Sequence, residues 1–188
     1  QRLEIPPKIA GLLMAAIISD TLMFRSPTCT QQDKIAASAL SLIADIKMEE
    51  FAREMFKAGS NLMDKTAEEI FYQDYKKFMA EGNVTFGVGQ ISSMDKDELM
   101  EIKERLLSFM ASECGRHGIS RIYFMLTDIM DESSELLYYG EGSREMAETA
   151  FHMEPTDGVF HLEGVVSRKK QLIPAMMEAA VMMGSEYN

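Results

Sequence analysis

The first 60 residues carry a hydrophobic pattern that predicts helices. Apolar side chains recur at helical spacing over residues 9–17, directly after two prolines that suit the first turn of a helix. Because this stretch is almost wholly apolar, we expect a helix that is buried on most sides and ends near Asp20. Two further helices are predicted over residues 33–46 and 48–58, and Thr30-Gln31-Gln32-Asp33 forms a capping box that opens the first of them.

The pattern changes after residue 73, where runs rich in β-branched and aromatic residues alternate with amphipathic helices. Ala80-Glu81-Gly82-Asn83 has the turn chemistry of a hairpin between the first two of these runs. Strands alternating with helices indicate an α/β layer structure. We expect strands at 75–79, 84–91, 119–130, 135–139 and 159–162, and helices at 66–72, 95–114 and 144–151.

The best candidate for a domain boundary is the segment 57–61, because it joins a helix stop at Gly59 to small and polar residues. We therefore expect a mainly helical part, residues 1–60, and a mixed-sheet domain flanked by helices, residues 61–188. The chain opens with Gln1 inside helix-forming sequence, which favours a piece cut from a longer protein.

Composition and charge narrow the possible functions. The chain has 46% hydrophobic and 26% charged residues, which is ordinary for a globular protein, and a net charge of -11. So acidic a chain argues against a general nucleic-acid surface. The apolar run at 9–18 is about half the length that spans a bilayer, so we expect no membrane role. Two cysteines without paired metal spacing suit a reducing cytoplasm.

Three adjacent cations, Arg168, Lys169 and Lys170, stand out in this acidic chain. A guanidinium can grip two phosphate oxygens at once, and a neighbouring ammonium supplies a mobile point charge. The following helix begins either near Ser167, which would place the cations in its first turn, or at Pro174. The alternative to an anion site is a solvated basic turn that balances an acidic surface.

Two further positions are candidates for chemistry. Lys76 and Lys77 form another adjacent cation pair, and neighbouring side chains of a strand point to opposite faces, so one of them can face a cleft. Asp20 lies at the C-terminal end of its predicted helix, where the macrodipole disfavours a carboxylate unless a cation, such as a divalent metal, or strong donors offset it. The simpler alternative is an Asp that accepts hydrogen bonds from backbone donors in the turn.

The chain resembles the C-terminal portion of the family II, manganese-dependent inorganic pyrophosphatases of the DHH phosphoesterase superfamily. The resemblance covers nearly the whole chain and rests on several motifs in the right order. These are the run 9–30 with Ser19-Asp20-Thr21, residues 55–59 with 64–69, Asp74-Tyr75-Lys76-Lys77-Phe78, Thr127-Asp128-Ile129 and Ser167-Arg168-Lys169-Lys170-Gln171.

The resemblance implies roles for four residues. Asp20 matches a manganese ligand, whereas Lys76, Arg168 and Lys169 match cations that bind pyrophosphate. It also implies that residues 1–60 are the tail of the DHH catalytic domain and that residues 61–188 are the DHH-associated, substrate-clamping domain. The expected cofactor is Mn²⁺, with Mg²⁺ or Co²⁺ as alternatives.

The chain departs from that family in one large respect. The other metal ligands of the family, its Asp-rich strand end and its Asp-His-His motif, do not occur in this sequence. A single Asp cannot hold a dinuclear centre, so we expect no catalytic residue and little or no hydrolysis from this chain alone.

Two other functions stay open. One is the C-terminal region of an exopolyphosphatase, although Gln171 after the basic triplet favours a pyrophosphatase. The other is a non-catalytic interaction module whose N-terminal helices pair with another chain. In the pyrophosphatase case those helices lack a covering surface, and we expect the isolated chain to self-associate through them.

Overall fold

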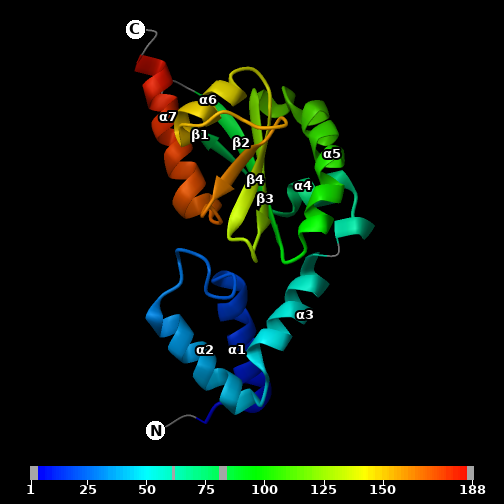
Figure 1. Cartoon of the computed structure of the whole chain (residues 1–188), viewed down its shortest axis with the longest axis vertical. Helices are drawn as coiled ribbons and strands as arrows, with labels where there is room; N and C mark the ends of the chain where they lie inside the picture. The colour runs from blue at the N-terminus through cyan, green and yellow to red at the C-terminus, as the bar shows by residue number, and fades with distance from the viewer. Residues whose placement is uncertain (1–3, 61, 81–83, 186–188) are drawn as a thin grey trace. The chain divides into compact units, whose positions relative to one another are not determined.

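The computed structural model describes residues 4–60, 62–80 and 84–185 of the 188-residue chain. The chain divides into two compact units, residues 1–60 and 61–188. Figure 1 shows the helices of the first unit in blue and cyan and the sheet of the second in green, yellow and orange. None of the described helices is both long and apolar enough to cross a bilayer.

The first unit consists of three helices, α1 (Pro7–Asp20), α2 (Gln31–Ala44) and α3 (Met48–Ser60). The predicted capping box is present, since the Thr30 hydroxyl accepts from the Asp33 amide and the Asp33 carboxylate accepts from the Thr30 amide. A small apolar core joins the helices, and α2 ends at Asp45, whose φ of 55° is left-handed. The core side chains are Ala10, Met14, Ile18, Leu40 and Ala52.

The prediction that α1 is buried on most sides is wrong for this chain. Ile9, Leu12 and Leu13 are exposed, with 68% of Leu12 accessible. The exposed positions 9, 12, 13 and 16 share one face of the helix, because they are separated by three or four residues. Residues 35, 39, 42 and 43 repeat that arrangement on α2. We name these two apolar stripes, residues 9, 12, 13 and 16 with 35, 39, 42 and 43, the helix faces.

The second unit is built on a five-stranded mixed sheet with strand order β1-β2-β3-β4-β5. Only the β2–β3 pair is parallel, and helix α5 makes the crossover between these two strands. The expected fold class, α/β with a mixed sheet flanked by helices, is confirmed. The strands are β1 (Tyr75–Met79), β2 (Thr85–Ser93), β3 (Arg121–Asp128), β4 (Ser133–Tyr139) and β5 (Phe160–Glu163).

Helices cover both faces of this sheet, as Figure 1 shows. One face packs against α4 and α5 through side chains such as Phe71 and Leu106, and the other packs against α6 and α7 through side chains such as Phe160 and Met176. The helical segments are η1 (Leu62–Asp64), α4 (Ala67–Gln73), α5 (Lys96–Glu113), η3 (Arg116–Gly118), α6 (Ser143–Phe151), the π-helix η4 (Arg168–Leu172) and α7 (Ile173–Ser185).

Most predicted elements of the second unit are present within a few residues of their expected bounds. β4 begins at Ser133, two residues before the expected start, and the predicted hairpin turn at 81–83 lies outside the described residues. Two glycines in β2 let aromatic rings lie against the sheet. A Cβ at Gly87 would overlap the Tyr75 hydroxyl, and one at Gly89 would overlap the Phe124 ring.

Candidate functional site

The basic triplet lies at the start of the last helix of the second unit. The Ser167 hydroxyl caps η4 by accepting from the Lys170 amide, and η4 continues directly into α7. Of the two starts that the sequence left open, the one near Ser167 is therefore confirmed. The wide π-turn ends just before Pro174, which has no N–H to donate and whose ring would crowd a regular α-helical turn behind it.

The Arg168 guanidinium is buried and fixed by three acceptors. Its Nη2 donates to Asp74 Oδ1 at 2.7 Å, and its Nη1 donates to the carbonyl oxygens of Asp74 and Val88, the latter at 3.2 Å. Only 8% of the Arg168 side chain is exposed, whereas the Asp74 side chain is 49% exposed. Arg168 is thus clamped against the start of β1 and the middle of β2.

Two glutamines hold the loop that presents the cations. Gln171 Oε1 accepts from the amides of Val166 and Ser167, each at 3.0 Å. Gln90, on β2, accepts from the Arg168 amide at 3.3 Å and donates to the Val166 carbonyl at 3.0 Å. The loop is therefore tied both to its own helix and to the sheet.

Lys76 lies on the same face of the sheet as this loop. In β1 it pairs with Val88, and directly paired residues of antiparallel strands point to the same face. Val88 belongs to the cluster that packs against α7, and its carbonyl contacts Arg168. Lys77 pairs with Gly87 and points to the other face.

The outer part of the site is cationic. Lys76, Lys169 and Lys170 are exposed, while Asp74 offsets the charge of the buried Arg168. The structure therefore brings together three of the four predicted site residues, Lys76, Arg168 and Lys169, on one side of one sheet. A multiply charged anion that approaches this side meets mobile ammonium groups around a rigid guanidinium.

Asp20, the fourth predicted residue, is the last residue of α1 in the first unit, and it is exposed. Since water can solvate an exposed carboxylate, its position at a helix C-terminus does not by itself require a metal. The turn that follows it is unusual, however. Leu22, Met23 and Phe24 have φ values of 48°, 52° and 69°, and such consecutive left-handed residues cost about 1–2 kcal/mol each.

Backbone strain of this kind is retained where the surrounding structure enforces it, and it concentrates at functional sites. Here the Thr21 hydroxyl enforces the turn, because it donates to the Ile17 carbonyl at 2.7 Å and accepts from the Phe24 amide at 3.2 Å. This strain is an observation in favour of a role for the Ser19-Asp20-Thr21 segment that does not depend on the resemblance.

A complete metal site is not formed by the described residues. Among residues 4–60, 62–80 and 84–185, no three His, Cys, Asp or Glu side chains gather closely enough to hold a metal ion. Mn²⁺ and Co²⁺ need several such ligands, so Asp20 and its described neighbours do not complete a site for either ion.

Sequence reasoning missed the residues that organise the site. The motif at residues 74–78 drew attention to Lys76 and Lys77, whereas in the structure Asp74 of the same motif binds Arg168. Nothing in the sequence indicated that Gln90 would hold the loop. Gln171 indicated only the kind of phosphatase in the sequence, but in the structure its side chain accepts hydrogen bonds from the amides of Val166 and Ser167 and so fixes the loop. The position of Asp74, just before the strand that carries Lys76 and Lys77, was the sequence feature that could have indicated a charged partner for a cation.

Comparisons with known proteins show the family of the chain. The model of a family described as the DHHA2 domain matches residues 53–179. A cobalt-dependent inorganic pyrophosphatase of Clostridium perfringens is 47% identical over 90% of this chain and 30% of its own length. A manganese-dependent inorganic pyrophosphatase of Methanothrix thermoacetophila is 42% identical over 93% of this chain and 56% of its own length.

The fold has a similar counterpart among solved structures. A crystal structure described as a candidate family II inorganic pyrophosphatase of Methanococcus jannaschii aligns with a TM-score of 0.82 and 40% identity, over 95% of this chain and 58% of that one. The chain thus spans between about a third and about three fifths of the length of these relatives.

Proposed function

Since the chain belongs to the DHHA2 domain family, we propose that it is the phosphate-binding part of an inorganic pyrophosphatase that depends on manganese or cobalt. In this proposal residues 61–188 clamp pyrophosphate, and residues 1–60 are the tail of the DHH catalytic domain. The observation that carries it is the register of β1 and β2, which places Lys76 on the face where Arg168 is clamped.

Each cation has a distinct role. Lys76 and Lys169 are exposed and carry flexible stems, so they contact phosphate oxygens directly and neutralise their charge. Arg168, fixed by Asp74, presents its remaining N–H donors in one orientation, so little conformational entropy is lost when an anion binds. Lys170 adds electrostatic support.

Asp20 contributes one ligand to a metal centre whose other ligands lie outside this sequence. When bound, Mn²⁺ or Co²⁺ would polarise phosphate oxygens and lower the pKa of a bound water. Because the described residues do not complete such a centre, we expect the 188-residue chain alone to hydrolyse little or no pyrophosphate. Robust manganese-dependent phosphate release by this chain would contradict the proposal.

The decisive experiment compares two neighbouring lysines. Pyrophosphate is titrated by calorimetry into the unaltered chain, Lys76→Ala and Lys77→Ala. Both lysines are exposed and lie in β1, but they point to opposite faces of the sheet. We expect Lys76→Ala to weaken binding by about tenfold, which corresponds to about 1.4 kcal/mol, and Lys77→Ala by less than about twofold.

Equal losses in the two variants would mean that pyrophosphate is attracted only by diffuse charge, and the assignment of the site would fail. Polyphosphate serves as a competitor in the same assay. Binding that strengthens strongly with polyphosphate length would favour an exopolyphosphatase instead.

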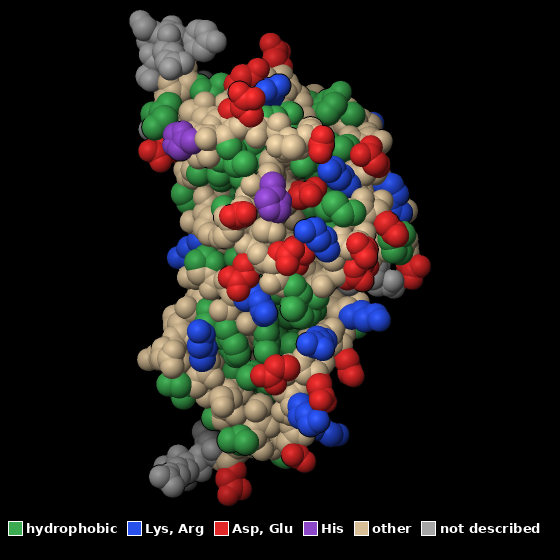
Figure 2. Space-filling view, viewed as in Figure 1, with side chains coloured by type: hydrophobic (Ala, Val, Ile, Leu, Met, Phe, Trp, Pro, Cys, Tyr) green, Lys and Arg blue, Asp and Glu red, His purple; other side chains and the backbone are tan. Residues whose placement is uncertain are grey.

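The isolated chain should also self-associate through the helix faces. Among residues 4–60, seven large apolar side chains are exposed, and Figure 2 shows hydrophobic side chains, in green, on one face of this unit. Such surfaces usually mark interaction sites. The double variant Leu12→Glu with Leu42→Glu should be more monomeric than the unaltered chain in sedimentation experiments. If the unaltered chain is itself a monomer at high concentration, self-association through the helix faces is contradicted.

The free thiols of Cys29 and Cys114 fit a reducing compartment, and we place the protein in the cytoplasm.

A further inference from the structure

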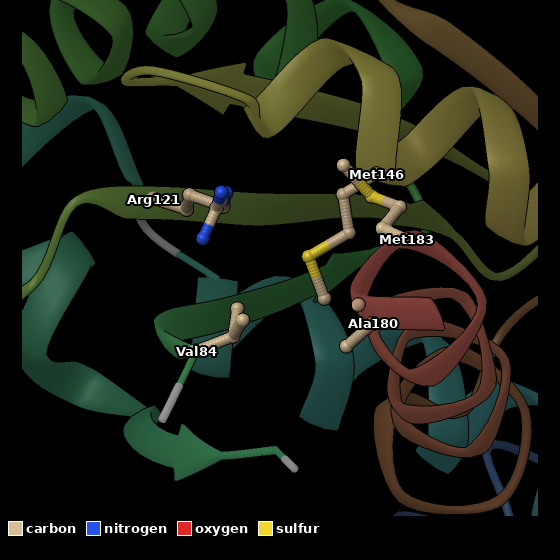
Figure 3. A pocket seen from close by; sticks show the side chains of 6 residues that line it. Val84, Arg121, Met146, Ala180 and Met183 are labelled. Atoms are coloured by element: carbon tan, nitrogen blue, oxygen red, sulfur yellow. The ribbon is translucent and has the colours of Figure 1, made fainter. Parts of the chain in front are cut away.

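A cavity lies on the same face of the sheet as Lys76 and Arg168. It has a volume of about 150 Å³ and lies between residue 84, just before β2, the first residue of β3, helix α6 and the last turns of α7 (Figure 3). Lys76 pairs with Val88, and Val88 pairs with Tyr123, so Arg121 lies two strands across and two residues along the sheet from Lys76, or about 12 Å between backbones. The lining residues are Val84, Arg121, Met146, Ala180, Met183 and Gly184.

Arg121 is the unusual member of this lining. Its Nε is buried, and within the described parts of the chain it has no hydrogen-bond partner. The guanidinium is always charged, and a buried donor that has no acceptor destabilises the fold. Figure 3 shows Arg121 on one side of the cavity and the methionines Met146 and Met183 on the other. The cavity lining is thus apolar except for a guanidinium whose Nε donor has no acceptor among the described residues.

The backbone next to Arg121 strengthens the attraction for an anion. Gly142 begins helix α6 with a φ of 71° and offers no side-chain cap to the first amides of that helix. A Cβ at Gly142 would lie 2.7 Å from Nη2 of Arg121, so the guanidinium packs directly against this glycine. The positive end of α6 and the Arg121 charge therefore act at the same place.

The apolar lining of the cavity determines the size and polarity of the part of the ligand that does not contact Arg121. Apolar cavities of about 150 Å³ accept a benzene-sized group, and methionine side chains adjust to its shape. A carboxylate matches the planar fork of a guanidinium, whereas a multiply charged phosphate would be desolvated here opposite a single cation. We propose that this cavity binds a small carboxylate that carries an aromatic ring or a short aliphatic chain.

The test uses the full 188-residue chain and benzoate as the probe, with saturation-transfer and chemical-shift NMR as readouts. We expect saturable binding with a Kd on the order of 1 mM. Benzamide has the same shape without the charge, and it should bind at least about tenfold more weakly. Pyrophosphate should not displace benzoate, because Lys76 lies on β1, two strands away from Arg121 on β3.

Three variants separate the guanidinium from the cavity. Arg121→Met should weaken benzoate binding about tenfold, and Arg53→Met, an exposed arginine of α3, should not change it. Gly184→Leu adds an apolar side chain to the cavity lining, its Cβ has nothing within 4 Å, and we expect it to weaken binding as well. This variant keeps the proposal testable if Arg121→Met does not fold.

Several outcomes would overturn the proposal. They are the absence of saturable benzoate binding in the millimolar range, equal binding of benzoate and benzamide, unchanged binding in both Arg121→Met and Gly184→Leu, and displacement of benzoate by pyrophosphate. The first of these would leave ordered water as the partner of Arg121.

Discussion

Replacing Arg168 by alanine should destabilise the second unit far more than the removal of a surface cation would. The guanidinium is the donor for the Asp74 carboxylate and for the carbonyl oxygens of Asp74 and Val88. Hydrogen bonds to charged groups contribute about 1.5–3 kcal/mol each, but Asp74 is half-exposed and water replaces part of its bond. We therefore expect Arg168→Ala to lower the free energy of unfolding by about 2–4 kcal/mol.

The sequence provides a clean assay for this loss. The chain has no tryptophan, and all six tyrosines lie at or beyond residue 72, so tyrosine fluorescence reports on the second unit alone. Urea unfolding followed by this signal gives the free energy of unfolding of that unit. Lys170→Ala is the matched control, because Lys170 is an exposed cation two residues away, and its loss should change stability by less than about 0.5 kcal/mol.

A double-mutant cycle isolates the ion pair. Asp74→Ala keeps the backbone carbonyl that binds Arg168, so we expect it to cost only about 1 kcal/mol, with a coupling to Arg168→Ala of at least about 0.5 kcal/mol. If Arg168→Ala proves no more destabilising than Lys170→Ala, the guanidinium is not fixed as described, and its role as a rigid anion fork is refuted.

Three further predictions follow from local geometry. Gly87→Ala should lower the Tm and cost about 1–3 kcal/mol, because its Cβ would overlap the Tyr75 hydroxyl, whereas Gly59→Ala, with nothing within 4 Å of its Cβ in helix α3, should be neutral or stabilising. Asp45→Gly should stabilise the first unit by about 1 kcal/mol in far-ultraviolet circular dichroism melts, because it relieves a left-handed residue and removes an anion at the C-terminus of α2; an unchanged melt would contradict this. The Thr66 amide and hydroxyl donate to the Glu69 carboxylate and hold its pKa below the usual 4.5. The ionised carboxylate therefore stabilises the fold above that pH, and this contribution is lost as the pH falls through the lower pKa of the folded state. Glu69→Gln should accordingly reduce the loss of stability that is measured on acidification.

The elements that could be predicted are those whose signals are local. The capping box predicted at Thr30 fixes the start of α2 with residues three apart and is present in the structure, and Thr66 with Glu69 forms a second such box at the start of α4. The alternating strands and α5 follow from periodicity alone. Lys76 and Lys77 were correctly expected on opposite faces, because side chains alternate along any strand.

What could not be predicted depends on contacts between distant residues. Asp74 and Arg168 are 94 residues apart, and periodicity does not encode that pairing. Periodicity alone predicted a buried α1, because an apolar stripe is the same in sequence whether or not another surface covers it, whereas the resemblance led us to expect uncovered helices. The π-turn and the left-handed turn at Leu22 are backbone solutions that side-chain patterns do not specify.

The bond between Asp74 and Arg168 also has a consequence for protein synthesis. A nascent chain that has left the ribosome only as far as β5 already contains Asp74, but the guanidinium that completes the pair is still missing. Products that terminate before residue 168 therefore cannot form this ion pair, even where most of the sheet has formed. The ion pair therefore forms only in chains that have been translated beyond residue 168.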